Sequence, residues 1–227
     1  MYVPRANALD DPAAIDALIS SAGAGDLVTA DADGLPYATR LPLVWLRDED
    51  RVIAHMAVAN PHWRTIDDGS PALVVVTGPQ AYVSPSWYAA KAEHGRVVPT
   101  WNYSRVELRG SVRVHREAGW LRDAVTRLTV VHERPRPEPW QVTDAPEAYV
   151  EGQLRGIVGI EVLVTSVAGK AKLSQNRSDA DRAGVVAGLR AEGGPEEHAV
   201  ADAMTADPLR PDVHSDSTSS HDVGSTR

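Results

Sequence analysis

The chain has 227 residues, of which 43% are hydrophobic and 24% charged, and its formal net charge is −8 at pH 7. This size fits one globular domain with a full core, and the acidic balance argues against broad nucleic-acid binding, which needs Lys and Arg to neutralise phosphates. The chain has no cysteine, which excludes disulfides, thiolate chemistry and Cys-based metal sites. No apolar run approaches membrane-spanning length and the first residues lack an export signal, so we expect a cytoplasmic protein without membrane contact.

The first third of the sequence predicts a short helix followed by antiparallel strands. Asp11 and Pro12 form an N-cap and first-turn pair, apolar residues follow at helical spacing, and Gly23 ends the helix. Two β-rich runs on either side of a polar turn predict a hairpin, in which Pro42 indicates an edge position or a bulge. A third run follows the hairpin. The expected strands are 26–30, 37–45 and 51–57.

The end of the third strand is a favourable place for an anion. The strand ends at His55 and Met56, and Asn60 with the proline after it begins another predicted helix, with Trp63 in its first turn. Free backbone N–H groups and the positive end of the helix dipole point the same way at such a helix start. The alternative is an ordinary strand–helix connection in which Trp63 packs against the core.

The rest of the chain continues as strands and helices up to a polar tail. The run 105–115 alternates apolar and mostly cationic residues, so it predicts a half-buried strand whose outer face either contacts a partner or pairs with acids. Residues 1–206 are predicted to form the folded domain, and residues 207–227, with few apolar residues, a disordered tail. The further strands are 73–77, 105–115 and 157–164, and the further helices are 117–133, 144–154, 178–189 and 195–206.

An aromatic stretch, GPQAYVSPSWY (78–88) closed by VPTWNY (98–103), is the most unusual part of the sequence. It combines Trp and Tyr with Ser, Asn and Pro, and the whole chain has six Trp and six Tyr but no Phe. Aromatic faces can stack on a planar ligand while hydroxyls and amides meet its edge, and the prolines stiffen the connection. An aromatic-lined dimer interface fits this composition equally well.

No nucleophile–base or nucleotide-binding signature occurs, so the catalytic residues stay unknown and no metal site is predicted. The eight His are scattered, and only His55 and His62 are candidates for a site. A basic block, 169–177, contains Lys and Arg but no acid in a chain that is acidic overall. Together with the anion-favouring helix start and the aromatic stretch, it forms the strongest candidate constellation.

The aromatic stretch resembles the PaiB family of FMN-binding split-barrel proteins, which are often called FMN-binding negative transcriptional regulators. Three further segments match in chain order: MYVPRANALDD at the start, HMAVANPHWRT (55–65) and GKAKLSQNRSDADRAGV (169–185). The resemblance extends to about Leu189, and several long motifs in the right order make it specific. The chain departs from the family at Arg40 and Gln80, where His is usual.

This resemblance implies an α+β, mostly antiparallel fold: an open, six-stranded, FMN-binding split β-barrel with flanking helices. It also implies a homodimer with FMN at the interface between two copies. FMN needs cations and helix-start amides for its phosphate, polar partners for its ring edge and an aromatic or apolar wall. The cofactor-binding positions carried over from the family motifs are His55, Met56, Asn60, Trp63, Ser84, Trp87, Asn102, Tyr103, Lys172, Ser174, Gln175 and Asn176.

Three functions follow from the resemblance. The first is a PaiB-type negative transcriptional regulator, acting indirectly because the acidic charge and the lack of a DNA-reading helix make direct DNA binding doubtful. The second is an FMN-dependent oxidoreductase acting on a small-molecule substrate. The third is a haem-binding or haem-degrading split-barrel protein with His55 or His62 as axial ligand. An absorption spectrum separates flavin from haem.

Overall fold

The computed structural model describes residues 1–206, and the predicted tail at 207–227 lies outside the described residues. The strands are β1 (Ala8–Leu9), β2 (Ala24–Ala30), β3 (Pro36–Leu46), β4 (Arg51–Ala57), β5 (Pro71–Val83), β6 (Thr100–His115) and β7 (Ile157–Lys172). The α-helices are α1 (Pro12–Ala22), α2 (Ala90–Glu93), α3 (Ala118–Glu133), α4 (Glu147–Leu154), α5 (Asp179–Glu192) and α6 (Pro195–Thr205). Short 3-10 helices include η1 (Arg5–Asn7), η3 (Pro61–Thr65), η4 (Pro85–Trp87) and η5 (Val142–Asp144).

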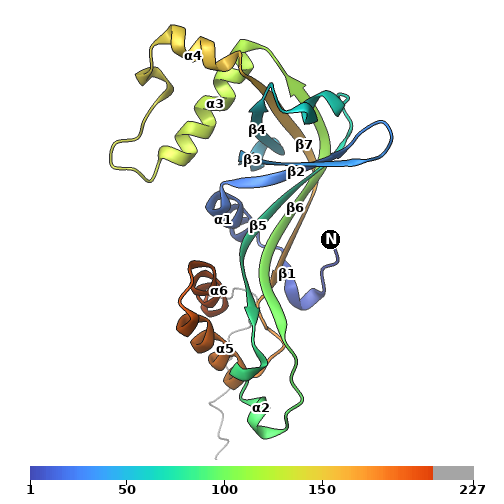
Figure 1. Cartoon of the computed structure of the whole chain (residues 1–227), viewed down its shortest axis with the longest axis vertical. Helices are drawn as coiled ribbons and strands as arrows, with labels where there is room; N and C mark the ends of the chain where they lie inside the picture. The colour runs from blue at the N-terminus through green and yellow to red at the C-terminus, as the bar shows by residue number, and fades with distance from the viewer. Residues whose placement is uncertain (207–227) are drawn as a thin grey trace, which may run out of the picture.

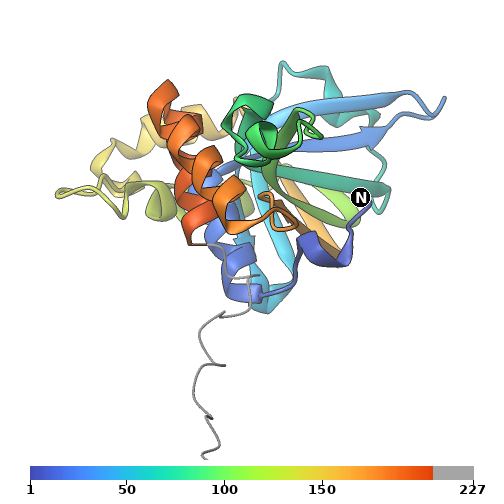
Figure 2. The same ribbon diagram turned by 90° about the horizontal axis from the view of Figure 1, so that it is seen from below.

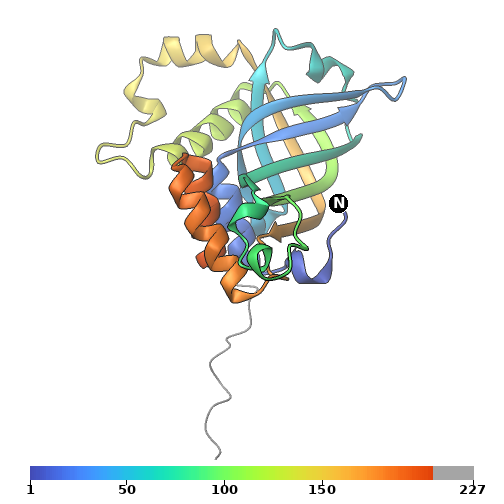
Figure 3. The ribbon, with the colours of Figure 1, turned by 60° about the horizontal axis from the view of Figure 1, so that its bottom comes forward.

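The strands form one antiparallel sheet that closes on itself (Figure 3). Their order is β1-β7-β4-β3-β2-β5-β6, and β6 also pairs with β7. Six strands, β2 to β7, therefore complete a ring, and β1 is added alongside β7. The predicted antiparallel, six-stranded barrel is confirmed, but its ring of pairings is complete, whereas an open barrel was expected.

The helices lie on one side of the barrel and the N-terminal segment lies on the other (Figures 1 and 2). α3 and α4 cover one end of the elongated molecule, α5 and α6 cover the other, and α1 lies between them (Figure 1). The long strands β6 and β7 run from one end to the other and pair from Tyr103 with Lys172 to His115 with Gly159. Residues at the two ends of β7 therefore lie near different helices.

The predicted helix boundaries have the expected local causes. The Asp11 side chain accepts a hydrogen bond from the backbone N–H of Ala13 at 3.1 Å, which satisfies a free donor at the start of α1. Gly23 ends α1 at φ 62°, a left-handed conformation that favours glycine. At α5, the Ser178 hydroxyl accepts from the backbone N–H of Asp181 at 3.2 Å. These short-range signals can be read from sequence because each depends on neighbouring residues only.

Three strands extend five or more residues beyond one end of their predicted ranges. β5 continues to Val83, β6 already begins at Thr100, and β7 extends to Lys172. The β5–β6 register shifts between Thr77 and Gln80, so the regular alternation that predicts a strand is interrupted there. Much of the aromatic stretch is therefore β-strand and not a connecting loop.

Two other local expectations need adjustment. The helix predicted at Asn60 is the five-residue 3-10 helix η3, which has fewer aligned dipoles than the α-helix expected there. Pro42 marks the place where β3 changes partner, since β3 pairs with β2 up to Pro42 and with β4 from Leu43 onward. A proline is tolerated there because one ladder ends where the next begins.

The apolar interior consists of two clusters. The larger one fills the barrel and extends to α1, α5 and α6, with Leu108, Val185 and Leu189 fully buried in it. The smaller one, formed by Leu121, Val142, Val150 and Leu154, joins α3, η5 and α4. α3 and α4 thus hold a small core of their own over the outer face of the sheet.

Candidate functional site

The basic loop, which we define as residues 173–177, follows directly on the end of β7. It turns sharply because Ser174 adopts a left-handed conformation at φ 61° and its carbonyl accepts from the backbone N–H of Arg177 at 3.1 Å. The loop, the end of β7, the start of β6 and the N-terminal segment surround a cavity of about 350 Å³, which we call the loop cavity. Five predicted residues line it: Asn102, Lys172, Ser174, Gln175 and Asn176.

Lys172 holds a fixed position in the wall of the loop cavity. Its Nζ donates to the Thr100 hydroxyl and, at 2.7 Å, to the carbonyl oxygen of Trp101. Burial, and less strongly the neighbouring Lys170, lower the pKa of the Lys172 ammonium. An ammonium has three donors, so these two contacts leave one for an anion.

Three of the predicted residues use their polar atoms to shape the loop. The buried Asn102 side chain accepts from the Ser174 hydroxyl at 3.1 Å and donates to the sulfur of Met204 at 3.4 Å. The Gln175 side chain accepts from the backbone N–H of Leu173 and donates to the Ala171 carbonyl, both at 2.8 Å. These residues support the site, and their polar groups are already engaged.

Arg182 of α5 supports the loop from behind and was not among the predicted site residues. Its buried guanidinium donates to the carbonyl of Leu173 at 2.8 Å and to that of Met204 at 2.7 Å. It ties the basic loop to the end of α6. The sequence does not show whether an arginine in an amphipathic helix is buried or exposed. The role of Arg182 is therefore visible only in the structure.

The groups that remain available to a ligand lie on the open side of the loop cavity. Arg177, beside Asn176, places its guanidinium carbon 4.5 Å from the ring centre of Tyr88, which orients it by a cation–π contact. Val98 and Pro99 supply an apolar wall. Thr100 and the segment around η1 also line the loop cavity and were missed, although the motif at the chain start was a usable signal.

His55 and Met56 lie at the opposite end of the barrel and on opposite faces of β4. Met56 is buried in the main core, whereas His55 faces a pocket beneath α3 and α4. Alternation along a strand sends neighbouring side chains to opposite sides, so both cannot line one cavity. Neither one lines the loop cavity.

Asn60 and Trp63 belong to a hydrogen-bonded junction around the buried His62. The Asn60 side chain accepts from the backbone N–H of His62 at 3.0 Å, and Trp63 Nε1 donates to the Val58 carbonyl at 3.0 Å. The ring nitrogens of His62 make hydrogen bonds to Thr29 Oγ1 at 2.9 Å and Thr39 Oγ1 at 2.7 Å. Both nitrogens are used, so in this conformation His62 has none left for haem iron.

Acid should weaken the fold through His62. Burial lowers the pKa of His62 in the folded chain, so below about pH 6.5 the unfolded chain takes up a proton that the folded chain does not. The free energy of unfolding should then fall as pH decreases, by up to about 1.4 kcal/mol per pH unit for this one proton. Urea unfolding at pH 7.5 and 5.5 tests this. The decrease in the free energy of unfolding between pH 7.5 and 5.5 should be smaller in His62→Gln. An equal decrease in both proteins would contradict this role of His62.

Ser84 and Trp87 connect the aromatic stretch to α5. The Ser84 hydroxyl caps η4 by accepting from the backbone N–H of Ser86 at 3.2 Å. The Trp87 indole lies against Gly188, where a Cβ would come within 2.3 Å of the ring. The two residues therefore have structural roles next to the loop cavity and do not line it.

Tyr103 lies on the outer face of β6, because it follows the inward-pointing Asn102. It lines a wider hollow of about 620 Å³, which we call the outer hollow, together with Gln80, Trp101 and Lys170. The ring centre of Tyr103 is 5.2 Å from Lys170 Nζ. Six of the twelve predicted residues thus line one or the other of these two hollows.

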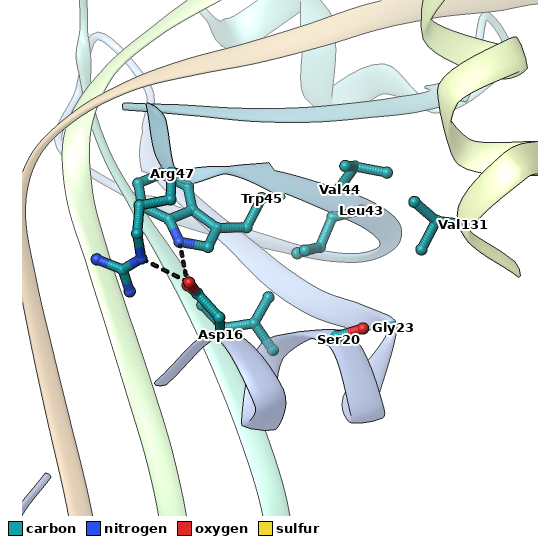
Figure 4. A pocket seen from close by; sticks show the side chains of 9 residues that line it. Asp16, Ser20, Gly23, Leu43, Val44, Trp45, Arg47 and Val131 are labelled. Carbon is teal, nitrogen blue, oxygen red and sulfur yellow. Dashed lines mark hydrogen bonds and ion pairs between the residues drawn. The ribbon is translucent and has the colours of Figure 1, made fainter. Parts of the chain in front are cut away.

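A smaller pocket of about 210 Å³ lies between α1, β3 and α3 (Figure 4). Asp16 is the only acid among the described residues that line it, and this carboxylate accepts from Trp45 Nε1 at 2.9 Å and from Arg47 Nε at 2.6 Å. It is used as a clamp between α1 and β3. Within residues 1–206, no cluster of three or more His, Cys, Asp or Glu side chains could hold a metal ion, and no helix is long and apolar enough to cross a membrane.

Comparison with known proteins identifies the family of this chain. A family model described as "Putative FMN-binding domain" matches residues 1–166. The chain is 32% identical over 206 residues to the protease synthase and sporulation protein PAI 2 of Bacillus subtilis (strain 168), covering 90% of this chain and 96% of that protein. The sequence resemblance is therefore supported over nearly the whole described chain.

Two solved structures share the fold. The FAD and heme binding protein from Mycobacterium smegmatis aligns with a TM-score of 0.55 and 17% identity, over 81% of this chain and 78% of that one. The flavocytochrome Anf3 from Azotobacter vinelandii aligns with a TM-score of 0.52 and 14% identity, over 80% of this chain and 78% of that one. At these identities the likeness concerns the fold alone.

The closed antiparallel barrel, its flanking helices and the family match define a split-barrel protein of the FMN-binding class. Within that class, the chain belongs to the PaiB-type family. FMN is the cofactor of this family, and the loop cavity has the chemistry it needs. Lys172 and Arg177 are cations for a phosphate, and Val98 with Pro99 offers an apolar wall.

Proposed function

We propose that the chain binds FMN with the phosphate at the basic loop, between Lys172 and Arg177. The observation that carries this proposal is the loop cavity, in which Asn102 and Ser174 meet although they are 72 residues apart in sequence. Its volume of about 350 Å³ is near the lower end of the roughly 300–1,000 Å³ that ligand pockets span. Bound FMN would supply electron or hydride transfer.

Replacing Lys172 with alanine should weaken FMN binding by about 1.5–3 kcal/mol, or roughly 10- to 150-fold, because a charge-assisted hydrogen bond is lost. Fluorescence titration of FMN into the full chain measures this. Lys91→Ala is the matched control, because Lys91 lies on α2 and its Nζ donates to Ser86 Oγ at 3.1 Å. The FMN affinity of Lys172→Gln should lie between those of Lys172→Ala and Lys91→Ala, because glutamine keeps a donor and loses the charge. Equal affinities in all four proteins would remove the phosphate assignment.

The complete FMN site is proposed to need two copies of the chain. Tyr82 and Trp101 are each 48% exposed, and their ring centres are 6.4 Å apart on the outer face next to the loop cavity. Val98, 64% exposed, extends this apolar surface, which we call the aromatic patch. Exposed apolar surface of this kind favours a protein interface. A homodimer joined through the aromatic patch would bring a second chain against the open side of the loop cavity.

The cellular role we propose is indirect negative regulation of transcription in the cytoplasm, as the family name suggests. The charges on the outer face of β6 argue against direct DNA contact. Arg105 and Arg109 donate to the buried Glu107 at 3.0 and 2.9 Å, and His115 lies 3.2 Å from Glu161. Arg105 and Arg109 are therefore paired within the chain. A regulatory effect would then pass through the FMN state or a protein partner.

An FMN-dependent oxidoreductase is the second candidate, and the outer hollow favours it because its 620 Å³ could admit a small substrate beside the loop cavity. Three measurements separate the candidate functions, including the haem alternative. The absorption spectrum of the purified protein should show flavin bands and no haem Soret band. Rapid bleaching of those bands by NADPH or NADH would favour the oxidoreductase. Slow bleaching, together with a change in reporter transcription on deletion, would favour the regulator.

A further inference from the structure

We propose that the pocket over His55 is a second binding site, for a small, flat, uncharged aromatic molecule that accepts one hydrogen bond from His55. This pocket, which we call the His55 pocket, has a volume of about 250 Å³. The sheet provides its floor, through His55 and Ile157. α3, η5 and α4 provide its walls. It is independent of the proposed FMN site.

The walls of the His55 pocket determine what kind of molecule fits. Val125, Val142 and Val150 present apolar side chains from three different elements. Among residues 1–206, no Lys, Arg, Asp or Glu lines this pocket. Burying a charge in such surroundings without a partner is costly, so the ligand should be neutral. The volume suits one or two fused rings.

Two aromatic residues flank the His55 pocket and remain unusually exposed. Trp140 is 46% exposed and Tyr149 is 60% exposed, although both line the pocket. Aromatic side chains gain most when their faces are covered, and a flat ligand at the rim would cover them. The exposure of these two residues therefore indicates an aromatic partner rather than an aliphatic one.

His55 supplies the polar contact at the floor of the pocket. Its Nδ1 is buried and has no hydrogen-bond partner among the described residues. Burial lowers its pKa, so the imidazole is neutral and carries one proton. A buried N–H without a partner is rarer and less tolerable than a buried acceptor, so the proton belongs on Nε2. Nε2–H is then the donor available to a ligand carbonyl or ring nitrogen.

A pair of probes of equal shape tests this contact. 1-Indanone is flat and neutral and has one carbonyl acceptor, whereas indane has the same rings without the carbonyl. Calorimetric or NMR titration into the full chain at pH 7.5 should show 1-indanone binding about fivefold more tightly than indane. His55→Leu should abolish this preference, and His132→Leu, in the last turn of α3 and not among the residues that line the pocket, should keep it. Trp140→Ala should weaken both probes.

Several results would overturn the proposal. Equal binding of the two probes to the unaltered protein would show that His55 does not donate, and this comparison stands even if His55→Leu fails to fold. If ¹⁵N NMR showed the proton of His55 on Nδ1, His55 Nε2 could not donate to the ligand, and the proposal would also fail. No binding of either probe at millimolar concentration would remove the site. A haem Soret shift that depends on His55, or a change in oligomeric state with Trp140→Ala, would assign the pocket to haem or to a second chain.

Discussion

Replacing Trp87 with alanine should lower the free energy of unfolding by about 3 kcal/mol, the low end of the range for a large aromatic residue lost from a core. The indole fills a groove on α5 at Gly188, where a Cβ would come within 2.3 Å of the ring, and at Gly184 a Cβ would come within 2.0 Å of the Trp87 carbonyl oxygen. Gly188 leaves this space for the indole, and alanine at position 87 would leave it empty. Urea denaturation at pH 7.5 measures the effect.

The same substitution should also weaken FMN binding, because α5 carries Arg182 and Arg182 holds the basic loop. Trp140→Ala is the control: Trp140 is 46% exposed, so its removal should change stability by less than about 1 kcal/mol. Gly188→Leu should destabilise the fold as Trp87→Ala does, by overfilling the groove instead of emptying it. If Trp87→Ala were no more destabilising than Trp140→Ala, the indole would not anchor α5.

Replacing Trp101 with alanine should shift the proposed homodimer towards monomer by about 2–4 kcal/mol, roughly 30- to 1,000-fold in dissociation constant. Trp101 lies at the centre of the aromatic patch, and its Nε1 donates to the Gln80 side chain at 3.2 Å. Its carbonyl also accepts from Lys172, so it joins the patch to the loop cavity. Sedimentation velocity over a dilution series measures the dissociation.

FMN should shift the same equilibrium in the opposite direction, because a ligand that binds only the dimer stabilises it by mass action. The dilution series is therefore repeated with and without FMN. Tyr2→Ala is a useful control, since Tyr2 is 81% exposed but lies outside the aromatic patch. A monomer that binds FMN as tightly as the concentrated protein would contradict the two-chain site and favour a self-contained flavin enzyme.

Sequence patterns predicted the parts of the fold that depend on neighbouring residues. The cap at Asp11, the left-handed Gly23 and the alternating strand 105–115 all act within one turn or one strand, and the structure confirms them. The family motifs also brought together Asn102 and the basic loop, which no local pattern could connect. Five of the twelve predicted contacts therefore share one cavity.

The other seven residues lie elsewhere because a motif does not tell which way its side chains point. His55 and Met56 are adjacent in one motif, yet the strand sends them to opposite faces. Ser84 and Trp87 are needed to attach α5. Asn60 and Trp63 serve the junction around His62. Distinguishing a ligand contact from a structural one required the partners of each polar atom, which only the three-dimensional structure provides.

The closure of the barrel through β7 also constrains how the chain can fold. β7 pairs with β4, β6 and β1, and one hydrogen bond that joins it to β4, from Arg51 to Glu161, spans 110 residues. Such distant contacts raise the contact order and slow folding. During synthesis the edges of β4 and β6 stay unpaired until β7 has left the ribosome, which exposes them to intermolecular pairing. The basic loop follows β7, so the proposed FMN site can form only after this last strand has closed the ring.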